Sequence, residues 1–62
     1  MAEFTIKLID KVQTVNNLSF EQVAISIGYD PEKLLLKLNE SDEMELIDLL
    51  FVKHPNSLKG MR

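Results

Sequence analysis

The chain has 62 residues, no cysteine, a single histidine and a formal net charge of −3. A chain of this length has room for one domain with one small core, and it buries only about 60% of the surface that its unfolded form exposes. The lack of cysteine excludes disulfides and thiolate metal sites, and a single histidine argues against structural zinc. The acidic balance argues against a generic nucleic-acid binder.

Apolar runs in the sequence are short. None approaches the roughly 18 residues of a membrane span, and the segment 1–9 is too short and too polar for a signal peptide. We therefore expect a cytoplasmic protein with no membrane partner.

The first predicted element is a helix over about residues 3–15. Its apolar residues recur at helical spacing and cover two faces: Phe4, Ile6, Leu8, Ile9, Val12 and Val15. A strand over Glu3–Leu8 is the alternative, because this segment is β-branched in part. Asn16 and Asn17 end the helix, since asparagine tolerates the left-handed conformation at a helix end.

Two short helices joined by a tight turn are predicted next, over about residues 20–28 and 31–38. Ser19 and Gln22 form a capping box for the first of them, and Gly28 ends it. Asp30 caps the second, and Pro31 takes its first position, where the missing N–H costs nothing. The residues expected to point inward are Val23, Ala24, Ile27, Leu34 and Leu38.

A fourth helix is predicted over about residues 43–53, rich in apolar residues. Asp42 or Ser41 is its expected N-cap, and Glu45 would complete a capping box with Asp42. Pro55 ends it, because the residue before a proline avoids the helical conformation. A further turn is expected around Leu58. The predicted fold class is a single all-α domain over residues 1–62, a compact bundle of four to five helices.

Apolar residues exceed what one small core can hold. Leu34, Leu35 and Leu36 are consecutive, and a helix cannot bury all three against one core. In the fourth helix, residues 46 and 50 and residues 47 and 51 are expected to point inward. Leu49 and Val52 are then expected to remain outside the core. We expect Leu35, Leu36, Leu49 and Val52 to form a protein contact, either a homodimer seam or a surface that grips a target.

The pattern Val23, Ala24, Ile27, Gly28, Tyr29 and Leu34 resembles the inward positions and turn of phage-repressor (Xre/Cro) helix-turn-helix domains. The resemblance covers about 55 residues, with one departure at Lys37, where the family usually has an apolar residue. It implies that the third helix enters the DNA major groove. The residues that it assigns to DNA contact are Gln22, Lys33, Lys37 and Asn39. Asp30 and Glu32 oppose this role, because a phosphate-lined groove repels carboxylates.

A second resemblance starts from the same turn. Ile27, Gly28 and Tyr29, followed by the leucines of the next two helices, look like the three-helix ubiquitin-associated fold. In that family a glycine–aromatic turn docks on a ubiquitin-like partner. This interpretation covers about 35 residues and leaves the first helix unexplained.

No catalytic site is expected. The serines have no candidate base except His54, and no glycine-rich phosphate loop is present. The acidic run at residues 40–45 lacks the glycine and alternating ligands of a calcium loop. We therefore expect no metal, no cofactor and no small-molecule substrate.

Two hypotheses for function remain. The first is a small transcriptional regulator of phage or mobile-element type, which binds DNA as a homodimer. The alternative is a protein-binding module on the same scaffold, such as an antirepressor or an inhibitor of a regulatory or host protein.

Overall fold

The computed structural model describes residues 2–40 and 43–61, and within these ranges it contains four α-helices and no strand. The helices are α1 (Glu3–Asn16), α2 (Phe20–Ser26), α3 (Pro31–Leu38) and α4 (Met44–Lys53). The predicted all-α class is confirmed. The strand alternative for Glu3–Leu8 is wrong, because this segment forms the first part of α1.

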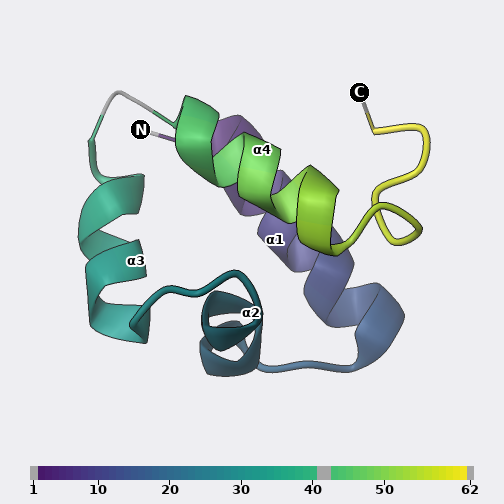
Figure 1. The fold of residues 1–62 in the computed structure, drawn as a ribbon, viewed down its shortest axis with the longest axis horizontal. Helices are drawn as coiled ribbons and strands as arrows, with labels where there is room; N and C mark the ends of the chain where they lie inside the picture. Colours follow the sequence, from purple (N-terminus) through teal and green to yellow (C-terminus); the bar gives the residue numbers. More distant parts are fainter. Residues whose placement is uncertain (1, 41–42, 62) are drawn as a thin grey trace.

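Four helices surround one core. In Figure 1, α4 lies along α1 and runs in the same direction, while α2 and α3 lie below and beside this pair. The axis of α2 points almost toward the viewer and α3 runs in the plane of the picture, so the two short helices cross steeply. No helix among the described residues is long and apolar enough to cross a membrane.

The ends of α1 and α2 follow the predicted local chemistry. Asn17 adopts the left-handed conformation, with φ of 55°, and the N–H of Leu18 donates to the carbonyl of Gln13. Ser19 and Gln22 form the complete capping box at the start of α2. α2 ends at Ser26 rather than at residue 28, because the chain turns at Gly28.

Gly28 makes the turn between α2 and α3, with φ of 84°. Its N–H donates to the carbonyl of Ile25, and the N–H of Tyr29 donates to the carbonyl of Ala24 over 2.9 Å. These two bonds are the Schellman pattern, in which a left-handed residue lets the chain satisfy the last carbonyls of a helix.

α3 and α4 begin differently. Asp30 accepts a hydrogen bond from the N–H of Glu32, and Pro31 is the first residue of α3, as predicted. The predicted caps of α4, Ser41 and Asp42, lie outside the described residues. The N-cap position of α4 is Glu43, whose side chain makes no capping bond. It instead accepts a hydrogen bond of 2.6 Å from the hydroxyl of Thr5 in α1.

The core collects apolar residues from all four helices and from the chain after α4. Every residue predicted to point inward from α2 and α3 is buried. The core residues are Ala2, Leu8, Ile9, Val12, Val23, Ala24, Ile27, Leu34, Leu38, Leu46, Ile47, Leu50 and Leu58. The turn around Leu58 is therefore confirmed as part of the core, although it is not a fifth helix. Phe4, Ile6 and Val15 remain exposed, so α1 buries one face rather than two.

Candidate functional site

The outer face of α3 is the surface that the sequence assigned both to DNA and to protein contact. We define it by the exposed residues of α3 and of the two positions that follow the helix: Glu32, Lys33, Leu35, Leu36, Asn39 and Glu40. Leu34 and Leu38 hold the opposite side of the helix against the core. Leu35 exposes 54% of its surface and Leu36 exposes 66%, so two neighbouring leucines face the solvent. Figure 1 shows α3 at the edge of the molecule.

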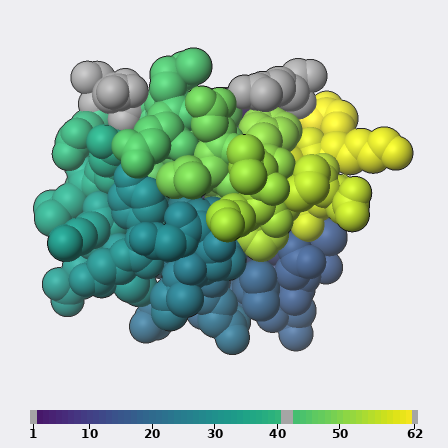
Figure 2. All heavy atoms as spheres, in the orientation of Figure 1, coloured from purple at the N-terminus to yellow at the C-terminus, as the bar shows by residue number. Residues whose placement is uncertain are grey.

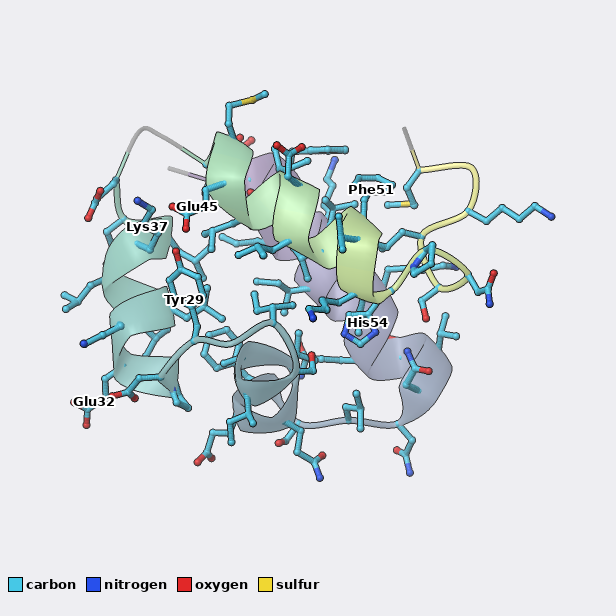
Figure 3. The ribbon with its side chains drawn as sticks, in the orientation of Figure 1. Tyr29, Glu32, Lys37, Glu45, Phe51 and His54 are labelled. Atoms are coloured by element: carbon cyan, nitrogen blue, oxygen red, sulfur yellow. The ribbon has the colours of Figure 1, made fainter. Side chains whose placement is uncertain are left out.

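Lys37 lies outside the outer face of α3. Its side chain is only 25% exposed, and its ammonium group pairs with Glu45 of α4 at 3.7 Å and with Glu40 at 4.0 Å. Figure 3 shows Lys37, Glu45 and Tyr29 pointing toward one another between α3 and α4. The predicted DNA contact of Lys37 therefore competes with an internal ion pair that links two helices.

Tyr29 completes this cluster. Burial raises the pKa of its hydroxyl above the usual range, and the hydrogen bond to the Glu45 carboxylate and the negative charge of that group act in the same direction. The neutral hydroxyl is therefore the donor to Glu45. The ring of Tyr29 packs against the core. Tyr29, Lys37 and Glu45 thus fasten the turn and α3 to the start of α4.

The other three residues predicted to contact DNA differ in their position and in their hydrogen bonds. Asn39 lies at the C-terminal end of α3, and its amide donates to the carbonyl of Leu35. The side-chain carbonyl of Gln22 is engaged in the capping box of α2. Lys33 is exposed and, within the described ranges, has no ion-pair partner. Lys33 and Asn39 are about 9 Å apart along the helix axis, so the structure does not bring these groups together.

The predicted protein contacts divide into two groups. Leu35 and Leu36 are consecutive on α3 and point about 100° apart around its axis, whereas Val52, which is 71% exposed, belongs to α4. The expectation that Leu49 is left over is wrong, because Leu49 is partly buried against the core. The reason is that Leu49 follows the buried Leu46 by three residues and precedes the buried Leu50, so it borders the buried stripe of α4. Ile25 on α2, which was not among the predicted inward residues, is a further exposed apolar residue.

Ser26 and His54 form the one serine–histidine contact in the described part of the chain. The Ser26 hydroxyl lies 2.6 Å from the carbonyl of Val23 and 2.8 Å from Nε2 of His54. A hydroxyl has a single proton, which Ser26 donates to the carbonyl, so it accepts from the imidazole. His54 is then a donor to Ser26 and not its base. The contact joins the end of α2 to the end of α4 (Figure 3).

The described surface offers no concave site. No pocket opens among these residues, and no group of three or more acidic, histidine or cysteine side chains is placed to hold a metal ion. Figure 2 shows one face of the molecule, on which side chains of α2, α3 and α4 meet without a deep hollow. A partner would therefore meet a convex surface, such as the outer face of α3. No family model, curated protein or solved structure matches the chain.

Proposed function

We propose that this protein is a small protein-binding module, which uses the outer face of α3 to capture a regulatory protein. The observation that carries the proposal is the exposure of Leu36 at the centre of that face and of Leu35 at its edge. Scattered surface leucines are normal in soluble proteins. Two adjacent ones on a short helix, whose other side already fills the core, form a convex apolar contact that suits a groove on a partner.

Charge supports the same proposal. The outer face of α3 carries the carboxylates of Glu32 and Glu40 and only one cation, that of Lys33. Binding to DNA depends mainly on cations that neutralise phosphates, and carboxylates on the contacting helix oppose it. The second lysine of α3, Lys37, is engaged with Glu45. The surface therefore suits a protein partner better than a duplex.

Affinity capture from the source cell tests the proposal. We expect the wild-type protein to retain a partner after nuclease treatment. A variant with Leu35→Gln and Leu36→Gln should bind this partner with at least about tenfold lower affinity, since a few buried apolar anchors supply most of the energy of an interface. Ile25→Gln is the control, because Ile25 is 67% exposed, close to the 66% of Leu36, but lies on α2. Circular dichroism should show all variants folded. Capture that nuclease abolishes would contradict the proposal.

DNA binding is the second candidate, and the arrangement of α2 and α3 favours it. The two helices cross steeply around the turn at Gly28, as in helix-turn-helix domains (Figure 1). Lys33 lies in the N-terminal half of α3, the part that such domains insert into the major groove.

Gel shifts with DNA from around the gene test this candidate. If DNA is the ligand, Lys33→Ala should weaken binding and reduce the slope of log affinity against log salt by about 1, because one phosphate contact is lost. Lys7→Ala on α1 is the control for a general loss of charge. Absence of any shift at about 50 mM salt would remove this candidate, since non-specific binding is strongest there.

The interpretation as a ubiquitin-associated domain has less support than protein binding through the outer face of α3 or DNA binding. Its glycine–aromatic turn needs an aromatic ring free for docking, whereas Tyr29 packs against the core and bonds to Glu45. In addition, α1 contributes Leu8, Ile9 and Val12 to the core, so it is an integral part of the fold.

A further inference from the structure

Two leucines hold α3 against the core along a single row. Leu34 and Leu38 are the buried residues of the helix, and they lie one turn apart on the same side. Contacts along one row, parallel to the helix axis, hold the helix in place but resist its rotation about that axis only weakly. We call this rotation the roll of α3. The roll therefore depends on contacts at the flank of the helix.

Lys37 makes such a contact. It lies about 80° around the helix axis from the middle of the row formed by Leu34 and Leu38. Its ammonium group is 3.7 Å from the carboxylate of Glu45, which belongs to the first turn of α4. The ion pair thus links the flank of α3 to a different helix. Rotation of α3 away from α4 would lengthen this contact.

Tyr29 brings a second group to the same carboxylate. It precedes the first residue of α3 by two positions, and its hydroxyl is the hydrogen-bond donor to Glu45. Figure 3 shows Tyr29, Lys37 and Glu45 pointing toward one another. The ring of Tyr29 packs against the core, so its position is fixed. One carboxylate therefore contacts the chain both before α3 and near the end of that helix.

We propose that Glu45 is a positioning residue for the outer face of α3, which sets the roll of the helix and thereby the direction in which Leu36 points. Leu36 lies at the centre of that face, so a change in roll moves it relative to a partner. The Glu45 side chain is 61% exposed, and an ion pair of this kind contributes little to global stability. Its removal should therefore affect the orientation of α3 more than the melting midpoint. This inference rests on the proposed function and describes how the fold controls that site.

Glu45→Ala tests the inference in the free protein, without a partner. Residual dipolar couplings of the backbone amides of the isotopically labelled full chain report the orientation of each helix. We expect the couplings of residues 31–38 to depart from the wild-type orientation, whereas those of α1 keep it. Asp10→Ala is the control, because it removes one exposed carboxylate from α1. Unchanged couplings in α3 of the Glu45→Ala variant would overturn the inference.

Tyr29→Phe and Lys37→Met divide the contact into its two parts. Each removes one polar group and keeps an apolar side chain of similar length, so each should fold even if Glu45→Ala does not. We expect both to change the couplings of α3 in the wild-type background. Neither should add to the effect of Glu45→Ala, because residues that share one contact are not additive. Additive effects, or no effect of either substitution alone, would show that Glu45 is not the shared anchor.

Titration of Tyr29 gives an independent readout. It is the only tyrosine, and the chain has no tryptophan, so the absorbance of tyrosinate reports this residue alone. Burial raises its pKa, the hydrogen bond and charge of Glu45 and the charge of Glu40 act in the same direction, and Lys37 opposes them. Glu45→Gln should therefore move the titration to lower pH. Because the native pKa is raised, the contact stabilises the fold below the usual pKa of tyrosine, and this effect is lost as the pH rises through the raised value. An unchanged titration in Glu45→Gln would contradict the contact.

Affinity capture separates this inference from the proposed function. Glu45→Ala should bind the captured partner with at least about threefold lower affinity, because only part of the population then holds α3 in the binding orientation. A changed orientation with unchanged capture would overturn the positioning role and leave the proposed function standing. If Leu35→Gln with Leu36→Gln leaves capture unchanged, the proposed function fails. The couplings would still decide whether Glu45 sets the roll of α3.

Discussion

Replacing Leu34 by alanine is expected to destabilise the protein by about 2–5 kcal/mol, the range for a leucine removed from a packed core. Leu34 is fully buried and joins α3 to the rest of the core. A domain of 62 residues has a total stability of only about 3–9 kcal/mol. A large part of the population should therefore unfold, which thermal melting followed by circular dichroism would show.

Leu36→Ala is the matched control, because it makes the same chemical change two residues further along the same helix. Leu36 is 66% exposed, so its truncation should change stability by no more than about 0.5 kcal/mol. Equal destabilisation by the two substitutions would contradict the assignment of Leu36 to the outer face of α3. The comparison thus tests the orientation of α3, on which both proposals depend.

Gly28→Val is expected to cost about 1–3 kcal/mol, because valine strongly resists the positive φ of 84° found at this turn. A Cβ atom added here would have no heavy atom within 4 Å, so the cost comes from the backbone conformation and not from a clash. A loss of this size lowers the melting midpoint of so small a domain by at least about 4 °C.

Gly28→Asn separates conformation from side-chain volume. Asparagine is larger than alanine but tolerates the left-handed region, as Asn17 does at the end of α1. We therefore expect Gly28→Asn to be less destabilising than Gly28→Ala. The reverse order, or an unchanged midpoint for Gly28→Val, would show that the turn can relax away from its positive φ.

The candidate site could be predicted only in part. Helical periodicity places Leu36 opposite Leu34 and Leu38 and leaves Leu35 at the border of the buried stripe, and the expectation that both are exposed is confirmed. The same reasoning failed for Leu49, because it borders the buried stripe of α4, and how much of such an edge position is covered depends on the packing around the helix. The ion pair of Lys37 could not be predicted from the sequence either. Its pairing with Glu45 depends on the approach of α4 to α3, which local sequence does not specify.

The sequence by itself determined where α2 and α3 begin and where the chain turns between them, since capping and turn formation involve residues only a few positions apart. Ser19, Asp30 and Gly28 behave as their local chemistry requires. Only the tertiary structure decided which polar groups meet across the fold. Thr5 bonds to Glu43, Asn16 to Ser57 and Ser26 to His54. These partners are separated by 38, 41 and 28 residues. Such pairs form only after the helices have packed, because the position of each depends on the apolar contacts of all four.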